Sequence, residues 1–403
     1  MSDSKRWLGF LASGWRAVRD GWLILGITLL LFLGLEVVYR AEGWLAGRFR
    51  TPATAKPLPH YHPYADSAWF PAYLREKGAL KFQWEPFVYT RGRPQRGEYL
   101  NIDSAGQRVV PKSGTGVPLR VFAFGGSTTW GFYDRDRATW PAVVARRLAA
   151  AGYAADVVDF GQLGYVSVQE LLALVLELRR GNVPDAVVFW DGVNDISAAR
   201  VNGRPGVSYR EFEHTTDADF VARMRTAGMR VDTKLAIRSL ASHSILLRKL
   251  LDATERPATV VPVPQPVPFC RAVMRDWVNQ ARLVDRLGHA FGFATLVIWQ
   301  PQWELSDRPQ SEYERRSPLT SPSALVSNDA GLDAHRRECA RVADSLVAGR
   351  AAESIVNLAG LHRGDTATVF LDRNSHTVER ATAIEGDTVA ALLLARLRAK
   401  PRR

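Results

Sequence analysis

The sequence predicts an α/β fold in which a parallel sheet is covered by helices on both faces. Short apolar segments rich in Val, Ile and Phe have the length of buried strands. The segments between them place apolar residues at helical spacing, so strands and helices alternate. With 403 residues and 46% hydrophobic residues, the chain can bury one large core, and we expect one main domain with additions.

The expected elements follow one another from residue 119 to the carboxyl end. We expect strands at 119–124, 156–160, 186–190, 294–299 and 354–358. We expect helices at 139–151, 168–180, 271–291, 331–348 and 386–397. Pro141 suits the first turn of the first helix, and Gly152 suits its end. Parallel strands need crossover helices of this kind, because both strands run in the same direction.

The amino-terminal segment has the pattern of a membrane anchor. Residues 1–20 carry several basic side chains, and the run from Trp22 to Val38 is apolar apart from Glu36. Such a run comes close to the roughly 20 apolar residues that a membrane-spanning helix needs. We therefore expect a cytoplasmic tail at 1–20 and a transmembrane helix at 21–40. A cleaved signal peptide is disfavoured, because the basic region is long and no small-residue cleavage site directly follows the apolar run.

The rest of the chain is expected outside the cytoplasm, in the periplasm, because basic residues before the span favour a cytoplasmic amino end. Arg40, Arg48 and Arg50 beyond the span weaken this bias. The two orientations can be separated by a reporter fused to the carboxyl end.

Composition divides the remaining chain into four parts. Residues 41–117 are rich in Pro, Gly and aromatic residues and predict a stalk that wraps around the main domain, with a short strand or hairpin at 99–108. The main domain is expected at 118–398. A polar and then Pro-rich insertion at 197–269 interrupts it, and insertions of this length are usually functional lids or mobile segments. Residues 399–403 form a basic tail.

Charge and cysteine content restrict the partners. The net charge is +12, but the basic residues are spread along the chain and no nucleic-acid-binding signature appears, so we expect no nucleic-acid partner. Anionic lipid head groups or an acidic polysaccharide are the favoured partners. Cys270 and Cys339 are the two cysteines, and the sequence does not decide whether they pair. His60 and His62 lack partner ligands at metal-binding spacing, so we expect no metal and no other cofactor.

The segment from Leu119 to Gly131 organises the domain. An apolar run of strand character stops at Gly125 and Gly126, and Ser127 follows. This order puts the serine just past the carboxyl edge of a parallel sheet, where open α/β folds bind their ligands. The two glycines allow a sharp turn and leave backbone amides free to face an anion.

Further chemical groups follow the next strands. Gly164 comes after the second expected strand, Asn194 after the third, and Asp372 and His376 lie before the last helix. Attack by a serine on an acyl carbon needs a base, an acid that orients the base, and donors for the oxyanion. The chain offers His376 as the base, Asp372 as its partner, and Ser127, Gly164 and Asn194 as the oxyanion hole.

The order Gly-Gly-Ser127, Gly164, Gly-Val-Asn194-Asp and Asp372 before His376 resembles the four blocks of the SGNH (GDSL-type) hydrolases. The resemblance covers about Leu119 to Leu397 and implies a flavodoxin-like three-layer αβα sandwich. It also implies the roles just given for Ser127, His376, Asp372, Gly164 and Asn194. The chain is similar to membrane-anchored bacterial members whose first block reads Gly-Gly-Ser-Thr-Thr and which carry a Gly-x-Arg element upstream, here Gly106-Gln-Arg108.

Two departures from the family pattern carry expectations of their own. Three residues separate Asp372 from His376 where the family usually has two, so we expect a less secure alignment of Asp372. Asp159 stands where an Asn is frequent, and the sequence offers no reason for it.

The expected activity is that of a serine esterase or acyltransferase of the cell envelope, acting on O-acyl groups of a carbohydrate. A non-catalytic polysaccharide-binding module with a degenerate cleft is the alternative. An α/β-hydrolase is disfavoured, because Gly-Gly-Ser-Thr-Thr does not supply the Gly-x-Ser-x-Gly elbow. A P-loop enzyme is disfavoured, because no Gly-Lys-Ser/Thr follows the glycines. The acyl acceptor, water or a sugar hydroxyl, and the oligomeric state stay open.

Overall fold

The structure is a computed structural model that describes residues 3–49, 58–209, 211, 244–246, 265–305, 308–316, 330–347 and 354–399. The chain divides into two compact units, Met1–Pro57 with Thr216–Val260, and Leu58–Thr215 with Val261–Arg403. Most of the insertion expected at 197–269, and residues 400–403 of the basic tail, lie outside the described residues.

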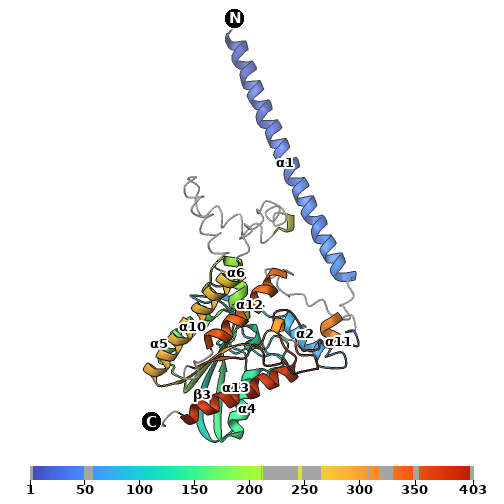
Figure 1. Ribbon diagram of the computed structural model, residues 1–403. Coiled ribbons are helices and arrows are strands. Elements are labelled where there is room, and N and C mark those ends of the chain that lie inside the picture. Colours follow the sequence, from blue (N-terminus) through green and yellow to red (C-terminus); the bar gives the residue numbers. More distant parts are fainter. Residues whose placement is uncertain are drawn as a thin grey trace. The chain divides into compact units, whose positions relative to one another are not determined.

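The larger unit is built on a five-stranded parallel sheet (Figure 1). Its strands are β3 (Val117–Gly125), β4 (Tyr153–Asp159), β5 (Ala186–Asp191), β6 (Ala294–Trp299) and β7 (Ile355–Asn357). They lie in the order β4-β3-β5-β6-β7, and every neighbouring pair is parallel. Numbered by chain position, this is the order 2-1-3-4-5 of flavodoxin-like folds. The predicted fold class is confirmed.

Helices cover both faces of the sheet. One face carries α4 (Trp140–Ala150) and α13 (Glu379–Ala399), and the other carries α5 (Ser167–Arg179), α6 (Val193–Asn202), α10 (Pro266–Phe291) and α12 (Ala330–Val347), as Figure 1 shows. Alternation along β3 explains the two cores, because Phe122 and Phe124 point to the second group of helices while Val121 and Ala123 point to the first. Shorter helical segments are α3 (Ser127–Trp130), η1 (Trp303–Leu305) and α11 (Glu312–Arg316).

Two helices begin earlier than predicted. Helix α10 begins at Pro266 instead of Arg271, because a proline fits the first turn of a helix, where its missing N–H needs no partner. Helix α13 begins at Glu379 instead of Gly386. Gly386 lies inside α13 for a packing reason, since a Cβ there would come within 2.5 Å of the Val143 side chain on α4. The expected insertion bounds therefore include parts of α6 and α10.

The segment between the anchor and the sheet has its own small elements. It contains α2 (Phe70–Gly78) and an antiparallel hairpin of β1 (Phe82–Glu85) and β2 (Tyr89–Gly92), neither of which the sequence indicated. Within the hairpin expected at 99–108, Ile102 forms an antiparallel bridge to Arg108, and Arg108 forms one to Asp159 of β4. A third apolar cluster joins aromatic residues of this segment to the loops that carry Trp130 and Phe370.

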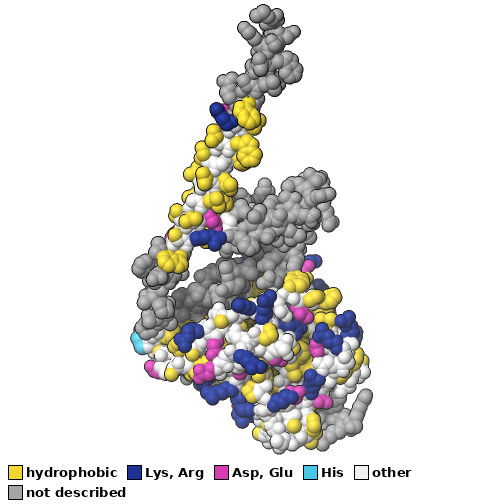
Figure 2. Space-filling view, turned by 180° about the vertical axis from the view of Figure 1, so that it is seen from behind, with side chains coloured by type: hydrophobic (Ala, Val, Ile, Leu, Met, Phe, Trp, Pro, Cys, Tyr) yellow, Lys and Arg dark blue, Asp and Glu magenta, His cyan; other side chains and the backbone are white. Residues whose placement is uncertain are grey.

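The smaller unit contains one long helix, α1 (Asp3–Phe49). Its stretch Val18–Glu42 has a mean hydropathy of 2.2 and is long enough to span a membrane, which holds for no other helix in the described part of the chain. Figure 2 shows apolar side chains all along this stretch, and Trp22 and Leu30 are each 70% exposed. Glu36, in contrast, is buried, and its carboxylate accepts hydrogen bonds from Ser244 and from the backbone amides of residues 245 and 246.

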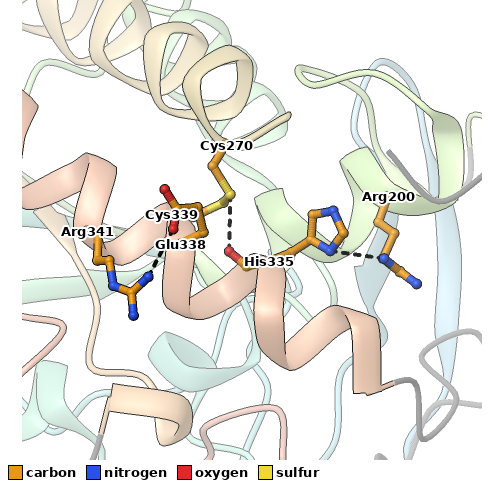
Figure 3. Close-up of a disulfide and its surroundings, with 6 residues drawn as sticks. All are labelled: Arg200, Cys270, His335, Glu338, Cys339 and Arg341. Carbon is orange, nitrogen blue, oxygen red and sulfur yellow. Dashed lines mark hydrogen bonds and ion pairs between the residues drawn. A yellow bond between two sulfur atoms is a disulfide. The ribbon is translucent and has the colours of Figure 1, made fainter. Parts of the chain in front are cut away.

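A disulfide joins Cys270 of α10 to Cys339 of α12, which decides the pairing that the sequence left open (Figure 3). Both residues are fully buried. The bridge closes a loop with a sequence separation of 69 residues and fixes the two helices side by side on one face of the sheet.

Candidate active site

The motif Gly-Gly-Ser-Thr-Thr forms the turn from β3 into α3, and each glycine is required by a specific neighbour. A Cβ on Gly125 would lie 1.9 Å from the Thr129 hydroxyl, and one on Gly126 would lie 2.2 Å from the side-chain nitrogen of Asn194. Thr129 is fully buried and accepts a hydrogen bond from the Trp140 indole. The turn is therefore rigid, and Ser127 lies at the carboxyl end of β3, next to the point where the strand order reverses.

Ser127, His376 and Asp372 form a continuous hydrogen-bonded chain. The Ser127 hydroxyl oxygen lies 2.7 Å from Nε2 of His376, and Nδ1 of His376 lies 2.7 Å from a carboxylate oxygen of Asp372. His376 and Asp372 are each 3% exposed. The two contacts use opposite nitrogens of one imidazole, so a proton on Nδ1 leaves Nε2 free to accept the serine proton.

Backbone and side-chain hydrogen bonds within the loop that carries Asp372 and His376 fix its shape. Phe370 and Thr377 form an antiparallel bridge, and the second oxygen of Asp372 accepts from the backbone amide of Asn374 at 2.9 Å. Ser375 has φ of 62°, and this left-handed residue takes up the extra length of the loop. The longer spacing therefore does not turn Asp372 away from the imidazole, and the expected loss of alignment is not found.

Asn194, one of the predicted oxyanion residues, lies beside the turn that carries Ser127. The side-chain nitrogen of Asn194 donates to the Tyr165 carbonyl at 2.8 Å, which leaves its second N–H for another acceptor. This nitrogen lies against Gly126, the residue before Ser127. Gly164 precedes Tyr165 and has φ of 75°, with little above its Cα but Tyr209. The loop after β4 and the start of α6 thus approach the serine turn from two sides.

Asp159, the residue without an explanation in the sequence, is fully buried at the end of β4. One of its oxygens accepts from the Gly161 amide at 2.7 Å and holds the turn that leads to Gly164. Burial raises the pKa of Asp159 well above its usual range. The side-chain oxygen of an Asn could accept the same hydrogen bond from the Gly161 amide, so an Asn is compatible with this position.

Arg108, the arginine of the Gly-x-Arg element, ties together the loop that follows the serine turn. Its buried guanidinium donates to the carbonyls of Trp130, Gly131 and Asp134 and pairs with Asp136 at 2.6 Å. The fixed fork of an arginine is suited to such divergent acceptors. Arg108 thereby determines the position of residues 131–133, which lie against His376.

Sequence analysis missed two aromatic residues that pack on the imidazole and two residues of α2 that support them. Phe132 stacks on His376 with 4.5 Å between ring centres, and Tyr133 packs edge-on to it. The ammonium of Lys77 lies 3.9 Å from the centre of the Phe132 ring and 4.0 Å from that of Tyr133. Tyr73, one turn before Lys77 on α2, donates from its hydroxyl to the carbonyls of Gly131 and Phe132. Tyr73 and Lys77 are four residues apart and so lie on one face of a helix, and this spacing was the signal in the sequence that could have pointed to them.

A cluster of buried acids lies at the start of α6, beneath Asn194. Asp195 accepts from Ser167, and Asp191 accepts from the Trp277 indole at 3.0 Å. Glu170 is hydrogen-bonded to Asp191. Burial raises the pKa of Asp191 to about 6 and that of Asp195 to about 7, and it raises the pKa of Glu170 well above its usual range. These acids therefore take up protons at a higher pH than exposed carboxyl groups do.

His62 has a structural environment. Its Nδ1 accepts from the Tyr64 amide, its ring packs on Phe70 and Tyr313, and burial lowers its pKa to about 4. Among the described residues, no three His, Cys, Asp or Glu side chains are grouped so that they could hold a metal ion.

The chain is similar to a known protein family and to several solved structures. Residues 123–292 match the model of the GDSL-like Lipase/Acylhydrolase family. No curated protein matches the chain. A carbohydrate acetylesterase family member from Sinorhizobium meliloti is 14% identical over 69% of this chain and 99% of its own, with a TM-score of 0.34. The aryl esterase of M. Smegmatis is 15% identical over 69% and 99%, with a TM-score of 0.37.

A member of the lipolytic protein G-D-S-L family from Veillonella parvula DSM 2008 is 13% identical over 68% of this chain and 96% of its own, with a TM-score of 0.35. The family model spans β3 at Ala123, the serine turn, Gly164 and Asn194, and ends with α10 at Gly292. The chain therefore contains a GDSL-like lipase/acylhydrolase domain, which the family model matches at residues 123–292.

Proposed function

We propose that the protein is a serine-dependent ester hydrolase or O-acyltransferase of the cell envelope, acting on O-acyl groups, most directly acetyl groups, of a carbohydrate. The observation that carries this proposal is the Ser127–His376–Asp372 chain with its two contacts of 2.7 Å. No metal or nucleotide is required, because the chain itself supplies a nucleophile, a base and a partner for the base.

The proposed reaction has two halves that share one intermediate. The Ser127 oxygen attacks the ester carbonyl while Nε2 of His376 takes its proton, and Asp372 stabilises the imidazolium that forms. The tetrahedral intermediate collapses, the C–O bond to the sugar breaks, and His376 returns the proton to the leaving hydroxyl. Water or a second sugar hydroxyl then attacks the acyl-serine, with His376 again acting as base, and Ser127 is released.

Negative charge on the carbonyl oxygen needs fixed donors. We propose the backbone amides of Ser127 and Gly164 and the second N–H of Asn194 for this role. The close approach of Asn194 to Gly126 supports this assignment, because it keeps the side-chain amide beside the serine turn. Loss of one such donor typically costs about 10²–10³ in turnover.

We also propose that α1 anchors the chain and that the hydrolase domain, 118–398, is extracytoplasmic, with the stalk at 41–117 between them. The exposed apolar surface of Val18–Glu42 supports an anchor. The disulfide between Cys270 and Cys339 supports an oxidising compartment such as the periplasm. A reporter fused to the carboxyl end that is active only in the cytoplasm contradicts this orientation.

The test uses the full-length chain in detergent micelles. Wild-type protein and Ser127→Ala are compared on p-nitrophenyl acetate and on acetylated glycans, with and without an added sugar acceptor. Transfer to the acceptor identifies an acyltransferase, and release of free acetate identifies an esterase. If the folded wild-type protein turns over no ester but retains glycan binding, the non-catalytic binding module is the better account.

A further inference from the structure

A groove with a volume of about 540 Å³ lies between α10 and α12, apart from the residues of the proposed active site. Its lining includes four arginines, Arg271, Arg275 and Arg282 on α10 and Arg341 on α12, against one acid, Glu338. Glu338 pairs with Arg341 of the same helix at 3.1 Å, and the groove as a whole is lined by more basic than acidic groups. Figure 3 shows Glu338 and Arg341 on α12 beside the disulfide.

The floor of the groove is aliphatic and its walls are fixed. Val278, Val342 and Leu346 contribute apolar surface between the arginines. The disulfide joins α10 to α12 at the level of Arg271 and Arg341, so the two walls are held at a constant separation. A preformed groove of this kind loses little entropy when a ligand enters it.

The groove is long as well as deep. Its lining on α10 runs from Val267 to Arg282, which is about 22 Å at 1.5 Å per residue. Because α10 leads directly into β6, its Val267 end lies toward the carboxyl edge of the sheet, the edge that carries Ser127. The groove therefore begins at the edge of the domain that carries the proposed active site, and it runs along α10 away from that edge.

We propose that this groove binds a segment of an O-acylated acidic polysaccharide, the arginines pairing with its carboxylates and the aliphatic floor receiving its acyl methyl groups. The proposal rests on the proposed function and narrows its substrate to a carboxylate-bearing glycan. Guanidinium groups bind carboxylates in a planar, bidentate manner, and Arg271 and Arg275 lie one helical turn apart, so both can face the same ligand.

Other anionic ligands fit the groove less well. Single-stranded nucleic acids bind on aromatic side chains that stack with bases, and none of the residues that line the groove is aromatic. Membrane surfaces bind convex amphipathic faces with large apolar side chains, whereas this site is recessed between two helices.

The test measures binding of a fluorescent oligogalacturonate to the full-length protein in detergent, by polarisation at two salt concentrations. A neutral malto-oligosaccharide of equal length and an oligothymidylate serve as competitors. We expect the double variant Arg271→Ala/Arg275→Ala to weaken oligogalacturonate binding about tenfold or more, since two charge-assisted contacts are lost. Arg179→Ala, an exposed arginine on α5, is the matched control and should bind as the wild-type protein does.

Three results would each contradict the groove proposal. Unchanged binding by the double variant, equal competition by the neutral chain, or stronger binding of the oligothymidylate overturns the proposal. Turnover of p-nitrophenyl acetate, measured in parallel, separates the two levels. If the wild-type protein hydrolyses the ester but does not bind oligogalacturonate, the groove proposal is wrong and the proposed reaction stands. If the wild-type protein and Ser127→Ala both bind oligogalacturonate but the wild-type protein hydrolyses no ester, the proposed reaction is wrong and the groove proposal stands.

Discussion

Asp372 and His376 face each other across 2.7 Å although three residues separate them in the chain. The left-handed Ser375 turns the loop, and the Asn374 amide holds the second carboxylate oxygen of Asp372. The Asn374 amide thus fixes the carboxylate from within the loop, while Phe132 and Tyr133 pack against the His376 ring.

The first prediction follows from this contact. Asp372→Ala should lower kcat on p-nitrophenyl acetate by about 10³-fold or more, close to the effect of His376→Ala, because both remove the oriented base. Steady-state kinetics with both variants, with folding checked by circular dichroism, make the comparison. A loss of less than tenfold for Asp372→Ala would mean that the imidazole is positioned by other contacts.

The second prediction concerns Lys77, which lies over the ring of Phe132 that stacks on His376. Burial lowers the pKa of Lys77 to about 8, so Lys77 is a cation below that pH. Its charge disfavours the second positive charge that forms nearby when His376 takes up a proton. Lys77→Met should therefore move the acidic limb of the kcat/KM profile to higher pH and remove any inflection near pH 8.

Lys81→Met is the control for this experiment, because Lys81 is exposed and lies beyond the end of α2. If Lys77→Met lowers kcat/KM by the same factor at every pH and leaves the position of both limbs of the profile unchanged, Lys77 has a packing role only.

Much of the domain could be predicted from the sequence, and the reason is periodicity. β3 and β5 are largely apolar, with Arg120 and Asp191 as the charged exceptions, and glycines mark their ends, so the loops that carry Ser127 and Asn194 could be located. These loops meet because parallel strands of one sheet end at one edge. The family pattern added the pairing of His376 with Ser127.

Other features depend on tertiary structure that local patterns do not reveal. Helix α2 and the hairpin before β3 are short and rich in aromatic residues, without a clear period. The disulfide depends on how α10 packs on α12. The alignment of Asp372 depends on the left-handed turn at Ser375, and the role of Asp159 depends on its buried contact with the Gly161 amide.

The third prediction tests that interpretation of Asp159. Asp159→Asn should leave ester turnover within about twofold of the wild-type value, because the amide oxygen can accept the hydrogen bond of the Gly161 amide as the carboxylate oxygen does. Asp159→Ala should lose stability by about 1–3 kcal/mol, since the Gly161 amide then has no partner. Thermal unfolding of the two variants measures this, and equal destabilisation by both would show that Asp159 acts as a carboxylate.

The fourth prediction concerns the acids beneath Asn194. Their pKa values are higher in the folded protein than the usual values near 4, so they stabilise the fold fully below about pH 4 and lose this contribution as pH rises through about 6–7. Glu170→Gln places a permanent donor beside Asp191. We expect this variant to gain stability relative to the wild-type protein at pH 8, on the order of 1–3 kcal/mol, with little gain at pH 5.

Chemical unfolding monitored by tryptophan fluorescence at the two pH values gives this difference. Asp66→Asn, at an exposed carboxylate, serves as the control and should show no such pH dependence. A gain for Glu170→Gln that is equal at pH 5 and pH 8 would contradict proton sharing in the cluster.

The central claim is that the hydroxyl of Ser127 is a nucleophile activated by His376. It is tested most directly by treating the full-length protein with a fluorophosphonate probe and identifying the modified residue by mass spectrometry. We predict covalent labelling at Ser127 that is lost in Ser127→Ala and strongly slowed in His376→Ala. Correctly folded wild-type protein that remains unlabelled, or is labelled at a different residue, would contradict the account.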